Sequence, residues 1–187
     1  MIEPIQSLTF HDDLHRYRYK GQWLAESVSG VIGFDMSPRQ REAIERTKDG
    51  PDGWAIRGET LHGWLEGLLK GSEPAIEERW TPWLDPLRSD PLFADFELLA
   101  TEYRLCDAKR SVGGSFDFLL RVRDDGPEKD WPVVLGDLKT VSSRKAVSSR
   151  KPATAQLGAY LSMMQQHHPR LWISECVTVV SGPDRCR

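Results

Sequence analysis

Two strand-like apolar runs, joined by a turn and each carrying one aspartate, constrain the fold of this chain most. Residues 115–122 and 133–140 are rich in apolar and β-branched side chains, and they contain Asp117 and Asp137. The segment DDGP at 124–127 is typical of a turn. Because side chains alternate along a strand, Asp137 and Lys139 are expected on one face. The pattern predicts an antiparallel hairpin with a carboxylate on each strand, which can hold a divalent metal.

The remaining periodicity predicts an α/β fold. Ser37 and Pro38 are typical of a helix start, a second helix is expected over 55–69, and a strand over 98–106 precedes the hairpin. A helix over 151–166, with Pro152 in its first turn, separates the hairpin from a final strand over 171–180. A helix between the third and fourth strands requires a crossover, so the central sheet is expected to be mixed.

At 187 residues the chain is expected to form one domain. Residues 1–35 are interpreted as an N-terminal β-hairpin region, and residues 36–180 as the helices and the core. No apolar run approaches the ~20 residues of a membrane span, and no basic and apolar leader opens the sequence. The three cysteines form no CxxC pair. These features favour a cytoplasmic protein without a membrane partner in a reducing compartment.

Charge is distributed unevenly along the chain. From Leu138 through Ser174 there is no acidic residue and there are six basic ones, so the rest must carry −9 to give the net charge of −3. Four of the basic side chains fall in a repeated SSRK sequence that is interpreted as a polar, mobile loop: Arg144, Lys145, Arg150 and Lys151. The segment either contacts the phosphate backbone of DNA or is a solvated loop, and the sequence leaves both open.

Four short motifs occur in order on the expected elements. They are GxxxH at 58–62, GxxD at 114–117, DxK at 137–139 and QxxxY at 156–160. Together, from Arg57 to Tyr160, they resemble the RecB-type branch of the PD-(D/E)XK nuclease superfamily. The N-terminal hairpin and the SVSGV sequence are similar to the lead-in of small phage-type exonucleases. The resemblance implies a restriction-endonuclease-like core, αβββαβ, with a mixed sheet flanked by helices.

The resemblance also implies roles for individual residues. Asp117, Asp137, the Leu138 carbonyl and His62 would hold the metal, and Lys139 would be the catalytic lysine. Gln156 and Tyr160 would line the site and contact the substrate backbone, and Glu102 would be an accessory acid. Taken singly, His62 could be an ordinary helix histidine, and Asp137 with Lys139 an exposed ion pair.

The expected cofactor is Mg²⁺ or Mn²⁺, because carboxylate and carbonyl oxygens suit Mg²⁺ and an imidazole favours Mn²⁺. The cysteines do not match the four-cysteine pattern of some RecB-type relatives, so no iron–sulfur cluster is expected. A ligand imidazole must be neutral, so metal affinity is expected to fall below pH ~6.5.

The expected activity is metal-dependent hydrolysis of DNA phosphodiester bonds, by an exonuclease of phage or recombination type. A structure- or sequence-selective endonuclease and a catalytically inactive DNA-binding module are the alternatives. A homo-oligomer or a recombination partner remains open.

Overall fold

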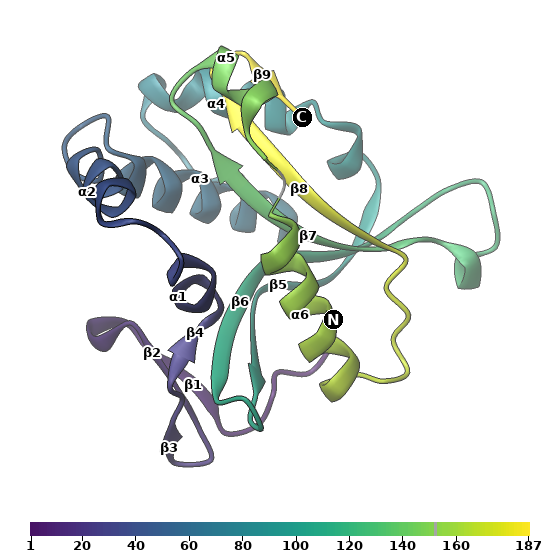
Figure 1. The fold of residues 1–187 in the computed structure, drawn as a ribbon. Helices are drawn as coiled ribbons and strands as arrows, with labels where there is room; N and C mark the ends of the chain where they lie inside the picture. Colours follow the sequence, from purple (N-terminus) through teal and green to yellow (C-terminus); the bar gives the residue numbers. More distant parts are fainter. Residues whose placement is uncertain (152) are drawn as a thin grey trace.

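The computed structural model describes residues 1–151 and 153–187 as an α/β fold with two sheets (Figure 1). The strands are β1 (Leu8–His11), β2 (Arg16–Tyr19), β3 (Gln22–Trp23), β4 (Glu26–Ser27), β5 (Phe96–Asp107), β6 (Val112–Val122), β7 (Val133–Thr140), β8 (Glu175–Gly182) and β9 (Arg185–Cys186). The α-helices are α1 (Val28–Gly33), α2 (Pro38–Arg46), α3 (Trp54–Leu69), α4 (Thr81–Arg88), α5 (Arg144–Ser149) and α6 (Thr154–His167). Short 3₁₀ turns are η1 (Asp12–Leu14), η2 (Glu78–Trp80), η3 (Pro91–Phe93) and η4 (Glu128–Asp130).

The larger sheet is mixed, as predicted. Strand β6 pairs antiparallel with β5 and β7, whereas β7 and β8 run parallel and are joined through α6. Strand β4 adds a short parallel pairing to β6, and β9 closes the far edge beside β8. The predicted hairpin is therefore confirmed as β6 and β7, and the expected crossover is α6.

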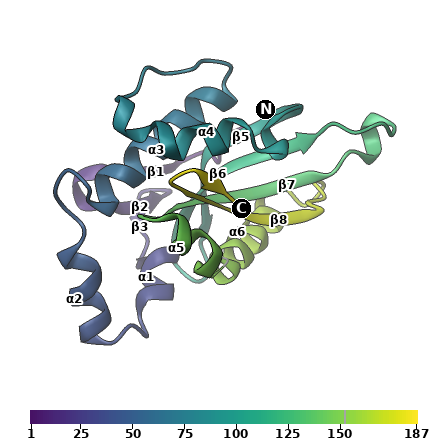
Figure 2. The same cartoon turned by 90° about the horizontal axis from the view of Figure 1, so that it is seen from above.

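Helices cover both faces of this sheet. The core between the sheet and helices α3 and α4 includes Leu61, Leu65 and Leu84 packed with Phe118. The opposite core packs α6 against the other face and centres on Leu157, Phe116 and Leu135. The view from above shows α3 and α4 on one side of the sheet and α6 on the other (Figure 2). The sheet is thus the middle layer of three.

The two central strands separate partway along their length. Strands β6 and β7 pair only between Phe118–Arg121 and Val133–Gly136. Beyond that point β7 continues beside β8, while the free edge of β6 is taken up at Val112 and Gly113 by β4. This fork leaves a gap in the sheet. Asp117 and Asp137 are the first residues beyond the last pair, Phe118 with Gly136, so the fork brings them opposite one another.

The N-terminal region is a small three-stranded antiparallel sheet instead of a two-stranded hairpin. Strand β2 pairs with both β1 and β3. Its inner face packs Leu8 and Tyr17 with Leu24 and Cys106, so the small sheet is attached to the end of β5. The chain then forms β4 and enters α1 directly, with the Ser27 hydroxyl accepting a hydrogen bond from the Gly30 amide. The third strand was not predicted from the sequence because β3 is only two residues long.

Three predictions differ in detail from the structure. The crossover helix begins at Thr154 instead of residue 151, and the placement of Pro152 lies outside the described residues. The last strand spans Glu175–Gly182 instead of 171–180, because the Ser174 hydroxyl bonds the backbone of Val133 and marks where pairing begins. The predicted mobile loop at 142–151 contains helix α5. Val147 is fully buried there, with Val141 and Val180, which anchors the helix.

In the part of the chain that the structure describes, none of the helices combines the length and the apolar character needed to cross a membrane.

Candidate functional site

Three potential metal ligands meet beside the fork. His62 comes from α3, Glu102 from β5 and Asp117 from β6. The His62 Nδ1 atom lies 3.1 Å from the Asp117 Oδ1 atom and 3.9 Å from the Glu102 Oε1 atom. One ligand atom from each residue falls within 4.8 Å of the other two. A nitrogen and two carboxylate oxygens at this spacing can coordinate one divalent ion.

The fold fixes the position of His62 through its neighbours in α3. Leu61 and Leu65 are fully buried in the core under the sheet. Their burial sets the rotation of the helix, so the adjacent His62 lies at the boundary between core and solvent. The side chain is 29% exposed. This is the environment in which an imidazole can reach both a buried carboxylate and a bound ligand.

Asp117 is held by the strand opposite. Its Oδ2 atom accepts a hydrogen bond from the Leu138 amide across the fork. The other oxygen, Oδ1, faces the His62 ring. In an extended strand the amide and the carbonyl of one residue point to the same side, so the Leu138 carbonyl is also directed toward the fork. The structure therefore brings Asp117, His62 and the Leu138 backbone together, as the sequence predicted.

Asp137 is the most buried carboxylate of the group, with its side chain only 2% exposed. The Lys139 ammonium lies 2.7 Å from Oδ2 and 3.0 Å from Oδ1. Only the contact to Oδ1 has hydrogen-bond geometry, so Oδ2 accepts no directed hydrogen bond from the residues described. A buried carboxylate oxygen normally requires a donor or a cation. Asp137 and Lys139 share a face, as alternation predicted, and the Lys139 ammonium is the cation that pairs with this carboxylate. The group of converging ligand atoms at His62, Glu102 and Asp117 does not include Asp137.

Glu102 has an unusual backbone. Its φ of +46° lies in the left-handed region, inside the otherwise extended β5. A non-glycine residue in that region costs of order 1–3 kcal/mol and persists only where its surroundings impose it. The Glu102 carboxylate lies toward His62. The sequence predicted an accessory position for Glu102, whereas the structure places it in the cluster itself.

The carboxylates strongly affect the protonation of His62. Burial opposes the charged imidazolium, but hydrogen bonds and charges from Asp117 and Glu102 outweigh it and raise the His62 pKa to about 10. The raised pKa moves the pH range in which metal affinity is expected to fall above the pH ~6.5 predicted from the sequence. At neutral pH His62 carries a proton at the point where a metal would bind. Metal and proton must compete for this nitrogen.

The environment of Asp137 favours the uncharged carboxyl group, whereas the environment of His62 favours the charged imidazolium. Burial and the nearby charge of Asp117 raise the Asp137 pKa to about 6, although Lys139 and His62 partly offset them. Because the folded state then binds this proton more tightly than the unfolded chain, stability falls as pH rises from ~4 to ~6. At neutral pH the metal-free protein therefore contains a destabilising buried carboxylate.

A stability prediction follows for metal-free protein. Asp137→Asn is expected to raise the melting temperature at pH 7.5 by about 2–4 °C, equal to ~1 kcal/mol for a chain of this size. The gain should disappear toward pH 4, where the parent carboxyl is already protonated. Asp117→Asn is the matched control and should give no gain, because it removes the partner of His62. Calorimetric melting curves in EDTA at both pH values check this. A lower melting temperature for Asp137→Asn at pH 7.5 would show that the Lys139 contact outweighs the burial cost.

The crossover helix contributes a buried pair. The Gln156 Nε2 atom donates a hydrogen bond to the Tyr160 hydroxyl over 2.9 Å, which confirms that the two share a helix face. Tyr160 is only 2% exposed, and its ring lies against Gly114. Burial raises the pKa of the Tyr160 hydroxyl, with Asp137 and Asp117 adding to the effect. The phenol therefore remains protonated at neutral pH. Its buried ring packs against β6, the strand that carries Asp117.

Tyr17 was not identified from the sequence as part of this region. Its ring lies on Gly113, where an added Cβ would come within 2.5 Å of it. Burial raises the pKa of Tyr17 to about 12, with opposing charges from Arg104 and Glu102. The pair of glycines at 113–114 carried the signal, because glycine inside a strand marks the close approach of another group.

The predicted basic segment is exposed and lies after β7. Arg144 and Lys145 open α5, and Arg150 and Lys151 follow it, all with exposed side chains. Arg187 holds the segment by donating hydrogen bonds to the carbonyls of Ser148 and Arg150. Arg144 and Lys145 are thus carried on an anchored helix, and Arg150 and Lys151 lie directly after its end. They do not join the cluster at the fork.

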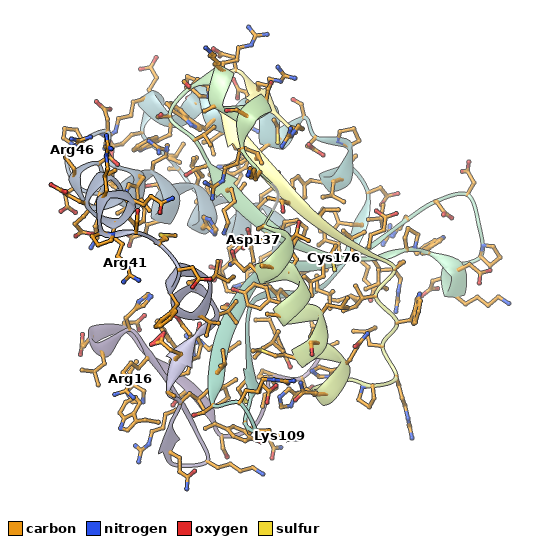
Figure 3. The ribbon with its side chains drawn as sticks, in the orientation of Figure 1. Arg16, Arg41, Arg46, Lys109, Asp137 and Cys176 are labelled. Carbon is orange, nitrogen blue, oxygen red and sulfur yellow. The ribbon has the colours of Figure 1, made fainter. Side chains whose placement is uncertain are left out.

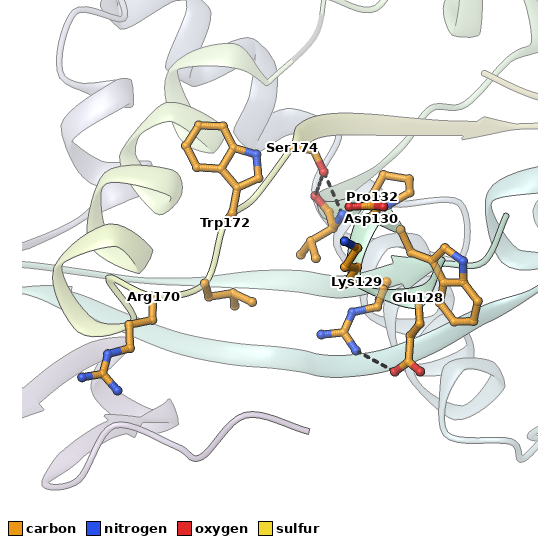
Figure 4. Close-up of a pocket in the computed structure, with 11 residues that line it drawn as sticks. Glu128, Lys129, Asp130, Pro132, Arg170, Trp172 and Ser174 are labelled. Atoms are coloured by element: carbon orange, nitrogen blue, oxygen red, sulfur yellow. Dashed lines mark hydrogen bonds and ion pairs between the residues drawn. The ribbon is translucent and has the colours of Figure 1, made fainter. Parts of the chain in front are cut away.

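A cavity of about 720 Å³ lies elsewhere, between the β6–β7 loop and the segment before β8. Trp172, Arg170 and Lys129 lie around it (Figure 4). This cavity is not lined by the site residues His62, Glu102, Asp117, Asp137 and Lys139. By contrast, Asp137 lies in the interior at the centre of the molecule (Figure 3).

A scan against models of protein families finds no match, and no curated protein matches the chain significantly.

Proposed function

We propose that this chain is a metal-dependent deoxyribonuclease with a restriction-endonuclease-like core, most closely an exonuclease of phage or recombination type. The proposal is supported by the arrangement of charged side chains at the fork. Two aspartates face each other across the fork, with a lysine on one of them and a histidine and a glutamate beside the other. The four-motif resemblance in the sequence falls on these same residues.

The residues present fit a divalent metal. Asp117, His62 and Glu102 offer one atom each at mutual distances within 4.8 Å, and the Asp137 carboxylate, paired with Lys139, lies across the fork from Asp117. The Leu138 carbonyl is directed to the same gap. A set dominated by oxygens suits Mg²⁺, and the imidazole favours Mn²⁺. The ligand set thus extends the one inferred from the sequence by Glu102.

The chain's own groups have separable tasks around a phosphodiester. A bound divalent ion would supply a water of lowered pKa and positive charge next to the phosphate. Lys139 offers a point charge that can neutralise a phosphate oxygen or orient a water. Asp137 holds that ammonium in place. Tyr160 and Gln156 form a rigid hydrogen-bonded support beneath them.

One comparison of DNA substrates distinguishes an exonuclease from an endonuclease and from an inactive DNA-binding module. Purified chain is incubated with Mg²⁺ or Mn²⁺ and with linear or covalently closed circular DNA. An exonuclease degrades the linear DNA and leaves the circle intact. Cutting of circles would indicate an endonuclease. Binding to either DNA without cutting would indicate an inactive DNA-binding module and would overturn the proposed activity.

The basic segment gives a prediction for DNA affinity. Changing Arg144, Lys145, Arg150 and Lys151 together to glutamine is expected to weaken binding and flatten its salt dependence. If all four side chains contact phosphates, the slope of log K against log salt falls by up to ~3.6, from about 0.9 per contact. Fluorescence anisotropy with labelled duplex DNA in EDTA measures the slope. An unchanged slope would show that α5 is simply a solvated helix and that the DNA follows another path.

A further inference from the structure

The outward face of the N-terminal sheet has an unusual composition. Register places Arg18 opposite both Thr9 and Trp23, and Arg16 opposite His11, on the face away from the core. The alternate residues, including Tyr17, pack inward. On the outward face every strand therefore contributes a polar, basic or aromatic side chain. Its nearest acidic residues in sequence, Asp12 and Asp13, lie in the turn η1 at one end.

The side chains of this face are organised around one tryptophan. The ring of Trp23 is 39% exposed. The Arg16 and Arg18 guanidinium carbons lie 5.3 Å and 5.6 Å from its centroid, and the His11 ring lies 4.8 Å away at 63°. These are cation–π and edge-to-face arrangements. An exposed aromatic ring flanked by two fixed cations presents both a stacking surface and positive charge.

The two arginines are preorganised. Arg16 donates a hydrogen bond from Nη2 to the Leu24 carbonyl, and Arg18 donates one from Nε to the Gly21 carbonyl. Each guanidinium keeps further N–H groups for an anion. Arg16 lies on the outside of the small sheet, away from Asp137 in the interior (Figure 3). A ligand would therefore find the cations already held beside the ring, which lowers the entropic cost of binding.

We propose that this face, formed by Thr9, His11, Arg16, Arg18 and Trp23, binds single-stranded nucleic acid, with a base stacked on Trp23 and phosphates on the arginines. Single strands offer unstacked bases and phosphates together, whereas a duplex conceals its base faces. An acidic peptide would match the charge but not the ring. The inference rests on the proposed function in that the polymer is taken to be the substrate.

The position of the face gives it a role at the cleavage site. Tyr17, between the two arginines, points inward and lies on Gly113 of β6. The same strand β6 carries Asp117. The chain then continues through β4, which pairs with β6 next to the fork. A single strand held outside β2 is therefore attached rigidly to the strand that carries a predicted metal ligand.

Binding is tested without cleavage, by fluorescence anisotropy of a labelled oligo(dT) of about 12 nucleotides in EDTA. Trp23→Ala is expected to weaken binding at least about tenfold, or ~1.4 kcal/mol, while Trp23→Phe stays within about threefold of the parent. Arg16→Ala with Arg18→Ala should also weaken it. Duplex affinity should change less than twofold with Trp23→Ala.

The controls are matched to these variants. Trp172→Ala removes a more exposed tryptophan outside the face. Arg79→Ala with Arg88→Ala removes two arginines that also lie over tryptophans. Both should leave oligo(dT) binding unchanged. Unchanged binding by Trp23→Ala, an equal loss for duplex, or equal competition by poly-glutamate would each overturn the inference. Because no metal is present, these outcomes are independent of whether the chain cleaves DNA.

Discussion

Asp117→Asn and Asp137→Asn are each expected to reduce DNA cleavage in Mg²⁺ or Mn²⁺ more than about a thousandfold, or ~4 kcal/mol of barrier. The two side chains face each other across the fork, and each supplies an anionic oxygen that an amide cannot replace. Initial rates on linear duplex DNA, with metal in excess, give the comparison.

The stability of the same variants supplies the control. Asp137→Asn should melt at a higher temperature than the parent in EDTA, so its loss of activity cannot come from unfolding. A charge-matched control is Asp184→Asn, an exposed aspartate in the turn between β8 and β9. It should keep parental activity. If either fork variant cleaves DNA within about tenfold of the parent, the assignment of the site is wrong.

The affinity for Mn²⁺ is expected to rise about tenfold per pH unit between pH 7 and 9. His62 has a pKa of about 10 in the metal-free protein, so a ligating imidazole must first lose its proton. Calorimetric titration in two buffers with different ionisation enthalpies should show about one proton released per ion. His62→Ala should lose both the proton release and most of the affinity at pH 9.

The His62→Ala variant also distinguishes a histidine that ligates the metal from one that is only a cation beside the carboxylates. If His62 were only a cation beside the carboxylates, Mn²⁺ would still displace its proton, but His62→Ala would bind the metal as tightly as the parent or more tightly. That result would remove His62 from the ligand set and leave Asp117, Glu102 and Asp137. His15→Ala, which removes an exposed histidine in a turn, should match the parent throughout.

The hairpin and its two aspartates could be predicted because their signals are local. Apolar alternation and the DDGP turn define β6 and β7, and period 2 places Asp137 and Lys139 together. The fork could not be predicted in the same way. It depends on β4, a two-residue strand that is distant in sequence and pairs with Val112 and Gly113.

The cluster of His62, Glu102 and Asp117 could be predicted from the sequence only in part. GxxxH places His62 on a helix, but Glu102 reaches it through a left-handed backbone that no pattern in the strand indicates. The shift in the His62 pKa likewise depends on two carboxylates brought close by tertiary structure. Helix α5 was missed because its polar SSRK repeats conceal one buried anchor, Val147.

Metal-dependent cleavage by the fork residues can be measured in one time course with end-labelled linear duplex DNA. Purified chain is first held in EDTA, and then Mn²⁺ is added in excess. We expect intact DNA during the first phase, rapid loss of label after the addition, and no loss at any time with Asp137→Asn. Cleavage that proceeds in EDTA, or DNA that stays intact in both Mn²⁺ and Mg²⁺, would contradict this expectation.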